Sequence, residues 1–242
     1  MSNNIASERV DCVVLFSGGQ DSTTSLYWAR EKFKGVHAIT FDYGQRHKIE
    51  IECAKKISQL AGLQSHEIID VTGILKTTSP LVDFSQAVGQ YRSVNELPGG
   101  IEPTFIPCRN VLFLTIAANR AVVKGIKDLV IGVSAIDYGG YPDCRLEFVQ
   151  LMKETLHQGL EMEINIHTPV ISLSKKDTVL LGSRISGCLE ALAYSHTCYE
   201  GKFPPCGKCH ACLLRMKGFK EAGIEDPLMG RATRSHDGEC HQ

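Results

Sequence analysis

A strand, a glycine-rich turn and a helix start follow one another in the stretch Val13-Val-Leu-Phe-Ser-Gly-Gly-Gln-Asp-Ser-Thr-Thr24. These residue types suit phosphate binding. Gly18 and Gly19 allow a tight turn and a close approach of the backbone to a ligand, and hydroxyl side chains follow at a helix N-terminus, which favours anions. The lysine of a Walker A loop is missing, because Gln20 and Asp21 follow the glycines, so phosphoryl transfer of the P-loop type is disfavoured.

Four cysteines near the C-terminus have the spacing C-x7-C-x2-C-x2-C, and they are Cys198, Cys206, Cys209 and Cys212. Four thiolates suit one tetrahedral zinc ion, and a closed site of this kind contributes to folding rather than to catalysis. A redox pair that carries sulfur, or an iron–sulfur cluster, is the alternative that the same spacing leaves open.

The chain has 242 residues, 43% of them hydrophobic, and a formal net charge of -1. This length and composition suit one folded α/β domain with a small addition. Because this charge gives no basic footprint for a phosphate backbone, we expect small-molecule substrates and no direct nucleic-acid partner. No stretch approaches about eighteen apolar residues, and residues 1–9 lack the regions of a signal peptide, so we expect a cytoplasmic protein without membrane contact. In that compartment, ten cysteines indicate a metal or catalysis rather than disulfides.

Apolar runs alternate with helical periodicities along the chain, which is typical of a parallel sheet covered by helices. Strands are expected over residues 10–16, 35–42, 65–71, 129–133 and 164–170. Helices are expected over residues 22–32, 49–60, 110–124, 146–158 and 174–185. The last helix begins with the capping box Ser174-Lys-Lys-Asp177.

Three polar loops follow predicted strands, over residues 17–22, 42–47 and 134–145. Ligands of an open parallel sheet bind beyond the carboxyl ends of its strands, so we expect these loops to line one cleft. The segment 77–108 is rich in proline and longer than a plain connection needs, and we expect it to be a lid or a substrate loop.

The loop Ser17-Gly-Gly-Gln-Asp-Ser22 resembles the pyrophosphate loop of the ATP-pyrophosphatase superfamily. The resemblance implies an adenine nucleotide alpha-hydrolase-like, Rossmann-like domain. In it, the loop holds the β- and γ-phosphates of ATP while a substrate oxygen attacks the α-phosphorus. The residues that it implies for ATP binding are consecutive: Phe16, Ser17, Gly18, Gly19, Gln20, Asp21, Ser22, Thr23, Thr24, Ser25 and Leu26.

Further motifs follow in one order: Phe41-Asp-Tyr-Gly-Gln-Arg-His47, Pro107-Cys-Arg-Asn110, Gly140-Tyr-Pro-Asp-Cys-Arg145 and the four cysteines. In this combination the chain is similar to the QueC family, the 7-cyano-7-deazaguanine synthases, from about residue 13 to residue 227. The resemblance implies an ATP-dependent ligase that turns 7-carboxy-7-deazaguanine and ammonia into the nitrile used for queuosine-type nucleosides. It also implies Mg2+ with the ATP, one structural zinc and a homodimer.

The same resemblance divides the chain into a pyrophosphate-loop domain over residues 1–187 and a small zinc-binding C-terminal region over residues 188–242. It assigns catalytic roles to three side chains. Asp21 is expected to hold Mg2+ on the pyrophosphate, and Lys175 is expected to reach the phosphates from the capped helix. Arg109 is expected to pair with the substrate carboxylate or with a phosphate, since arginine suits bidentate contacts to anions.

The substrate-binding residues expected beside Arg109 are Arg46, Tyr141 and Asp143. The Asp143 carboxylate can accept hydrogen bonds from the ring N–H and the exocyclic amine of a guanine-type base. Cys108 departs from the family, whose members usually carry Gly or Ala at this position, and this leaves open an activated thiol next to Arg109.

Three other activities stay open from the sequence. A related ligase would pass the activated deazaguanine acid to another amine, such as a protein N-terminus. A tRNA-thiolating enzyme would share the pyrophosphate loop and use its cysteines for sulfur or a cluster. The third alternative is a zinc-stabilised nucleotide-binding protein without catalytic activity.

Overall fold

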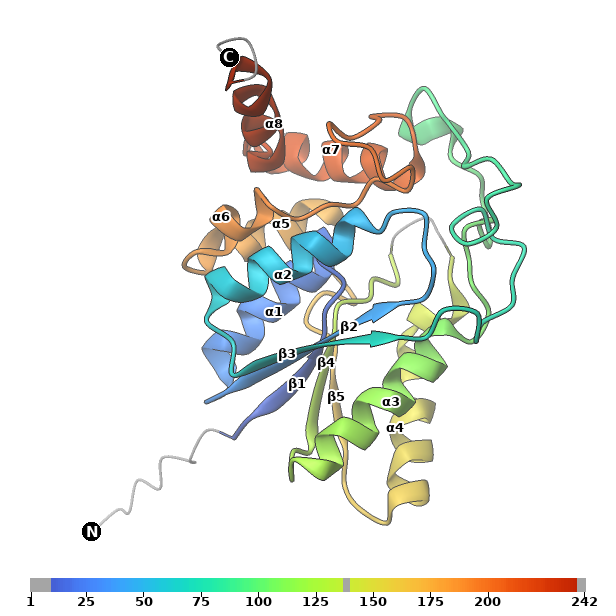
Figure 1. Ribbon diagram of the computed structural model, residues 1–242, viewed down its shortest axis with the longest axis vertical. Coiled ribbons are helices and arrows are strands. Elements are labelled where there is room, and N and C mark those ends of the chain that lie inside the picture. The colour runs from blue at the N-terminus through green and yellow to red at the C-terminus, as the bar shows by residue number, and fades with distance from the viewer. Residues whose placement is uncertain (1–9, 137–139, 239–242) are drawn as a thin grey trace.

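The computed structural model describes residues 10–136 and 140–238. In them, one sheet of parallel strands has the order β3-β2-β1-β4-β5 (Figure 1). The strands are β1 (Cys12–Leu15), β2 (Val36–Asp42), β3 (Ser65–Asp70), β4 (Asp128–Ile131) and β5 (Asn165–His167). The predicted α/β class with a parallel sheet is confirmed.

The helices are α1 (Gln20–Lys32), α2 (Ile49–Ala61), α3 (Arg109–Val123), α4 (Leu146–Leu160), α5 (Lys175–Arg184), α6 (Cys188–Leu192), α7 (His210–Ala222) and α8 (Pro227–Gly238), with the 3-10 turns η1 (Val94–Glu96) and η2 (Pro142–Cys144). Each predicted helix is present within a few residues of its expected bounds. The last predicted strand was too long, because Pro169 has no N–H for the sheet and β5 ends at His167. The helices α6, α7 and α8 were not predicted.

The side chains of β1 alternate between two hydrophobic cores. Val13 and Leu15 pack with residues of α3 and α4. Cys12 and Val14 pack on the opposite face with residues of α1 and α2 and of the later helices α5, α6 and α7. Figure 1 shows the same two layers on either side of the sheet. The C-terminal helices therefore lie on the face that also carries α1.

The strand order reverses at the centre of this parallel sheet, because β1 pairs with β2 on one side and with β4 on the other. In open α/β sheets such a reversal opens a crevice at the carboxyl ends of the two central strands, where ligands bind. The fold thus predicts a site beyond Leu15 and Ile131, the last residues of β1 and β4.

The segment between β3 and α3 runs along one side of the molecule toward the N-terminal end of α7 (Figure 1). The Tyr91 N–H donates a hydrogen bond to the Lys208 carbonyl oxygen (2.8 Å), and Val88 packs against three of the four cysteines, Cys198, Cys209 and Cys212. This segment therefore joins the sheet to the cysteine region. Within residues 10–136 and 140–238, no helix combines the length and the apolar character needed to cross a bilayer. The division of the chain at residue 187 stays a prediction.

Candidate active site and metal centre

Serine hydroxyls hold the turn between β1 and α1. The Gly19 N–H donates to Ser17 Oγ (3.1 Å), the Ser17 N–H donates to Ser22 Oγ (3.3 Å), and Ser22 Oγ donates to the Gly19 carbonyl oxygen (3.1 Å). Because α1 begins at Gln20, the N–H groups of its first turn have no acceptor within the helix and can bind an anion. The strand, turn and helix that a phosphate loop requires are present.

Two glycines let this loop pack closely on its neighbours. Gly18 has a φ of 89°, and a Cβ there would lie 2.8 Å from the Ala54 backbone nitrogen in α2. A Cβ at Gly132, just after β4, would lie 2.8 Å from the Asp21 carbonyl oxygen. Larger residues at either position would displace the loop, so α2 and the end of β4 fix its place.

The catalytic candidates Asp21 and Lys175 meet at this loop. Lys175 Nζ donates to Asp21 Oδ2 at 2.5 Å. Lys175 is the first residue of α5, which Ser174 caps by accepting a hydrogen bond from the Asp177 N–H (3.1 Å), so the predicted capping box is present. The cap orients the start of α5, and with it Lys175, toward the phosphate loop.

A cavity of about 290 Å³ lies at the carboxyl ends of β1 and β4. Its walls include residues of the three predicted loops: Ser17, Gly19, Gln20, Asp21 and Ser22; Tyr43, Gln45 and His47; and Ser134, Gly140, Tyr141 and Cys144. Lys175, Tyr199 and His210 add walls from the C-terminal part of the chain. The predicted convergence of the three loops on one cleft is confirmed, with residues 137–139 of the third loop outside the described residues.

Buried polar atoms in this cavity lack partners among the described residues. The Gln20 side chain is 1% exposed, and neither its amide oxygen nor its amide nitrogen is hydrogen-bonded. The Ser134 hydroxyl on the opposite loop is likewise unpartnered. A buried polar group without a partner costs about 1–3 kcal/mol, so these atoms fit a polar ligand that completes their hydrogen bonds.

A second polar cluster lines the cavity beside the phosphate loop. His47 Nε2 lies 3.4 Å from the Tyr43 hydroxyl and 3.7 Å from Glu50 Oε2. Burial raises the pKa of Glu50 to about 8, although Arg109 acts in the opposite direction. Burial, together with Arg109, lowers the pKa of His47 to about 3, so its imidazole is neutral at physiological pH.

The four predicted substrate residues fall into two pairs. Arg109 and Tyr141 line the cavity, and the Arg109 guanidinium lies 6.0 Å from the centre of the Tyr43 ring. Burial acts to lower the pKa of Arg109, but Tyr43 and other acidic neighbours raise it above its usual value, so the guanidinium stays charged. Tyr141 donates to or accepts from Thr104 Oγ1 at 2.6 Å.

Arg46 and Asp143 are engaged with the backbone of neighbouring segments. Arg46 Nε donates to the Pro80 carbonyl oxygen (3.0 Å) and Arg46 Nη2 to that of Gln86 (2.8 Å), which ties down the segment after β3. Asp143 Oδ2 accepts from the Asn110 N–H (3.2 Å) at the start of α3. Neither side chain is among the residues that line the cavity, and their substrate roles stay predictions.

A buried chain of contacts links the cavity to the cysteine region. His210, the first residue of α7, is in close contact with Glu102 through its Nδ1, and both side chains are almost fully buried. Glu102 accepts a hydrogen bond from Thr104 Oγ1 (3.0 Å), which is bonded in turn to the Tyr141 hydroxyl. The residue that follows Cys209 thus helps to position a wall of the cavity.

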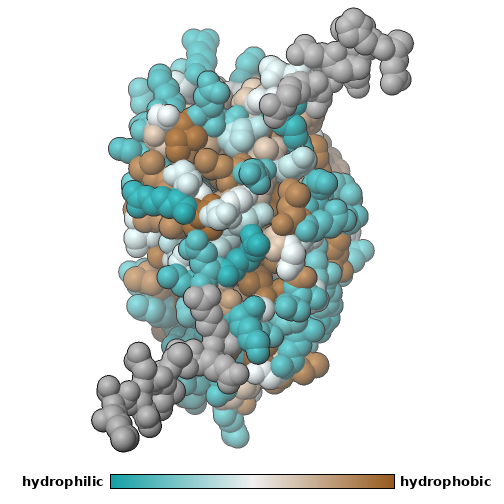
Figure 2. Space-filling view, turned by 90° about the vertical axis from the view of Figure 1, so that its left-hand side faces the viewer, coloured by the Kyte–Doolittle hydropathy of each residue, from teal (hydrophilic) through white to brown (hydrophobic). Residues whose placement is uncertain are grey.

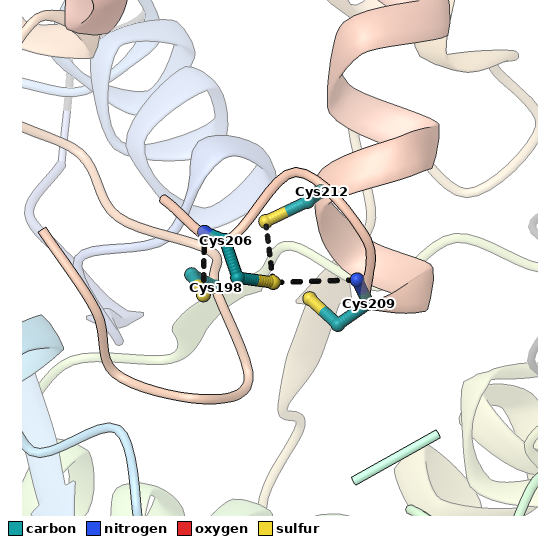
Figure 3. A group of neighbouring side chains, drawn as sticks. All are labelled: Cys198, Cys206, Cys209 and Cys212. Atoms are coloured by element: carbon teal, nitrogen blue, oxygen red, sulfur yellow. Dashed lines mark hydrogen bonds between the residues drawn. The ribbon is translucent and has the colours of Figure 1, made fainter. Parts of the chain in front are cut away.

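The four predicted metal ligands come together at the N-terminal end of α7 (Figure 3). All four sulfur atoms lie within 4.8 Å of one another, and Cys206 Sγ lies 3.9 Å from Cys212 Sγ. A tetrahedral zinc with bonds of about 2.3 Å places its sulfur ligands about 3.8 Å apart, so this set can hold one metal ion of that size.

Backbone N–H groups surround these thiols. The N–H groups of Lys208 (3.4 Å) and Cys209 (3.3 Å) donate to Cys206 Sγ, and the Cys206 N–H donates to Cys198 Sγ (3.4 Å). Such bonds stabilise thiolates and orient them for a metal. Cys108 lies apart from this group; it is exposed, has a left-handed φ of 61° before α3, and is not part of the cavity wall.

The sequence reasoning missed Glu50, His210 and Glu102. Glu50 falls in a helix that was predicted from its apolar residues alone. The available signal was its position, because the first turn of a helix that follows a strand and a polar loop lies near the carboxyl edge of the sheet. Glu102 gave no local signal, since its contact with His210 joins segments far apart in the chain.

Comparison with known proteins gives a family and close relatives. The family model described as "Queuosine biosynthesis protein QueC" matches residues 11–223. A 7-cyano-7-deazaguanine synthase of Gloeobacter violaceus is 51% identical over 221 residues, which are 89% of this chain and 94% of the relative. The enzymes of the same name from Chromobacterium violaceum and Laribacter hongkongensis are 47% and 45% identical, over 97% and 90% of this chain and 99% and 94% of the relatives.

Proposed function

The chain belongs to the QueC family of queuosine biosynthesis proteins and is an enzyme, and on that premise we propose that it makes 7-cyano-7-deazaguanine from 7-carboxy-7-deazaguanine, ammonia and ATP. The observation that carries the proposal is the 51% identity, over 89% of the chain, to a relative with that activity in its name. The cavity with a phosphate loop on one wall and a charged arginine on another supports it.

The phosphates of ATP bind in this proposal at the first turn of α1. The N–H groups there, the Ser17 hydroxyl and Lys175 Nζ supply the donors, and the unpartnered Gln20 amide gives a further polar contact. Asp21, already within reach of Lys175, is the residue that would hold Mg2+ beside the pyrophosphate. The next residues of α1 are buried and pack beneath the phosphate loop in this proposal; they are Thr23, Thr24, Ser25 and Leu26.

The chemistry runs through two adenylations. The substrate carboxylate attacks the α-phosphorus, pyrophosphate leaves, and ammonia then displaces AMP from the acyl carbon to give an amide. The amide oxygen attacks the α-phosphorus of a second ATP, pyrophosphate leaves again, and loss of AMP and of the remaining N–H protons gives the nitrile. Charge stabilisation and exclusion of water carry both steps, because water would hydrolyse the activated acyl group.

The remaining residues bind the deazaguanine acid. We assign Arg109 to the carboxylate, because it is charged, buried and in the cavity wall, and Tyr141 to the rim beside it. Arg46 holds the segment 80–86 and Asp143 holds the start of α3, so in this proposal both residues position the segments that line the substrate site.

The metal in this proposal is one structural zinc held by Cys198, Cys206, Cys209 and Cys212. Zinc there contributes folding energy and fixes the start of α7, where His210 lines the cavity. A cytoplasmic location and a homodimer belong to the same proposal.

Pyrophosphate exchange tests the first step without ammonia. Protein, ATP, Mg2+ and labelled pyrophosphate are incubated with 7-carboxy-7-deazaguanine, with 7-deazaguanine as the matched control that lacks the carboxylate. The proposal expects label in ATP only with the acid. No exchange with the acid, or equal exchange with the control, overturns it. A coloured protein whose cysteines hold iron instead of one zinc would favour the tRNA-thiolating alternative.

A further inference from the structure

One carboxylate in the cavity has no role in the adenylation chemistry. Glu50, in the first turn of α2, is 13% exposed through its side chain and lines the cavity. A Cβ placed at Gly19 would lie 3.4 Å from Glu50 Oε1, so this oxygen adjoins the phosphate loop. Among the described residues the carboxylate accepts no hydrogen bond, and its recorded ionic neighbour is His47 Nε2 at 3.7 Å.

The surroundings of Glu50 favour a small cation. A carboxylate next to a phosphate loop repels the anionic groups that the loop binds, unless a cation lies between them. His47 is not that cation, because burial keeps the pKa of its imidazole near 3. Burial, together with Cys198, opposes ionisation of Glu50 and raises its pKa to about 8, although Arg109 of α3 acts in the opposite direction. Such a group ionises when a cation binds beside it.

Aromatic rings form the other walls of this corner. The ring of His47 lies 6.4 Å from that of Tyr43 and 6.1 Å from that of Tyr199, measured between ring centres, and all three residues line the cavity. The Tyr43 hydroxyl, the neutral His47 imidazole and the Glu50 carboxylate can each accept a hydrogen bond from one small monovalent cation. Mg2+ is usually bound through one or two carboxylates together with substrate phosphates and waters, and Asp21, beside Lys175 at the phosphate loop, is the carboxylate proposed above for that ion.

We propose that Glu50, with Tyr43 and the neutral His47 beside it, binds the ammonium ion that supplies the nitrile nitrogen. The inference rests on the proposed function, in which ammonium is the one substrate that is cationic at neutral pH. The Glu50 carboxylate adjoins the phosphate loop, where the acyl phosphate forms, and it lines the same cavity as Arg109, which is assigned to the substrate carboxylate. Ammonium held there passes one proton to the Glu50 carboxylate, and the ammonia that remains attacks the acyl carbon in the same cavity while AMP leaves with the electron pair of the broken bond.

The test compares Glu50→Gln with Glu52→Gln in the zinc-loaded enzyme. Glu52 lies on the same helix but is 69% exposed and pairs with Lys55 on the surface. Two reactions are followed: acid-dependent pyrophosphate exchange without ammonium, and product formation at increasing ammonium. In a third assay hydroxylamine replaces ammonium near pH 7, where hydroxylamine is neutral and needs no counter-ion, and the hydroxamate is measured.

For Glu50→Gln we expect the KM for ammonium to rise at least about tenfold, with exchange and hydroxamate formation reduced by less than about threefold. Glu50→Asp, which keeps the charge, should give an intermediate KM, and Glu52→Gln should match the wild type. An unchanged KM for ammonium overturns the proposal. So does an equal loss of exchange, which would place Glu50 in phosphate or Mg2+ binding, or an equal loss of hydroxamate. If the wild-type enzyme itself shows no exchange, the proposed function fails instead.

Discussion

Asp21 and Lys175 are 154 residues apart in the chain, and their side chains meet at 2.5 Å where the phosphates of ATP are proposed to bind. We predict that Lys175→Ala lowers turnover at least about 100-fold, since about 3 kcal/mol of transition-state stabilisation is lost with one buried cation. Its free energy of unfolding should change by less than about 2 kcal/mol, because other contacts hold α5. Steady-state kinetics and urea unfolding measure the two effects.

Lys176→Ala is the matched control for that prediction, because Lys176 is the next residue of α5 and is exposed. It should keep wild-type turnover. Wild-type turnover in Lys175→Ala would remove Lys175 from the site.

The raised pKa of Glu50 should also make the free energy of unfolding depend on pH. Its pKa is about 8 in the folded chain, against about 4.3 for a free glutamate, so at intermediate pH the folded form keeps a proton that the unfolded form has lost. The unfolded state then binds fewer protons, and the free energy of unfolding falls as the pH rises through this window. In Glu50→Gln the side chain at this position does not ionise, so the variant lacks this decrease in the free energy of unfolding.

The stability of Glu50→Gln relative to the wild type should therefore grow by roughly 1 kcal/mol per pH unit from pH 6 to pH 8 and level off above that. Urea unfolding of zinc-loaded protein in ammonium-free buffers measures the difference. A difference that does not vary with pH would contradict the raised pKa.

At the scale of elements, α7 fixes the place of Lys175. A Cβ at Gly218 of α7 would lie 2.7 Å from the Lys175 Cβ, so the absence of a side chain at this position lets the two helices touch at Lys175. We predict that Gly218→Ala moves the start of α5 by a few tenths of an ångström or more and lowers turnover at least about tenfold.

The control for Gly218→Ala is Gly159→Ala in α4, where a new Cβ would meet nothing within 4 Å. It should leave turnover unchanged and should not destabilise the fold, since alanine favours a helix more than glycine does. Turnover in Gly218→Ala equal to that of Gly159→Ala would show that α7 does not position Lys175.

The elements around the phosphate loop could be predicted because their signals are local. Gly18 and Gly19 follow an apolar strand, and Ser174 has its capping partner three residues later. The strand, the turn and the cap are therefore each indicated by residues that are close together in the chain. The side chains of Arg46 and Glu50 could not be placed in this way. Arg46 binds carbonyl groups about 40 residues away, and Glu50 faces the cavity only because α2 packs over Gly18.

At the scale of the molecule, the four cysteines gather where the chain enters α7. The chain emerges from Cys209 directly into α7, whose residues contact both the cavity and Lys175. We predict that removal of the metal by a chelator, or Cys206→Ser, lowers the melting temperature by at least about 10 °C and abolishes turnover, because metal binding is coupled to folding.

Cys108→Ser, which changes an exposed thiol outside the cluster, is the control and should match the wild type in thermal unfolding with and without chelator. A melting temperature that is insensitive to chelator would mean that the four thiols hold no structural metal. Activity loss in Cys108→Ser alone would instead revive the activated thiol.

The outer surface gives less information about partners than the cavity does. Figure 2 shows hydrophilic and hydrophobic residues interspersed on the face that it presents, and exposed apolar side chains such as Phe84, Val123 and Leu151 come from separate elements. Single apolar residues of this kind are normal on soluble domains. The homodimer therefore stays a prediction that rests on the family resemblance.

Mass spectrometry of the products tests directly whether the enzyme makes the nitrile. The zinc-loaded enzyme is incubated with 7-carboxy-7-deazaguanine, ATP, Mg2+ and ammonium of natural or nitrogen-15 composition. We predict the nitrile with one ammonium-derived nitrogen, together with AMP and pyrophosphate. Release of pyrophosphate with only the adenylate, or with an adduct of another amine, would contradict nitrile synthesis but not activation of the acid. No pyrophosphate at all would contradict both activation of the acid and nitrile synthesis.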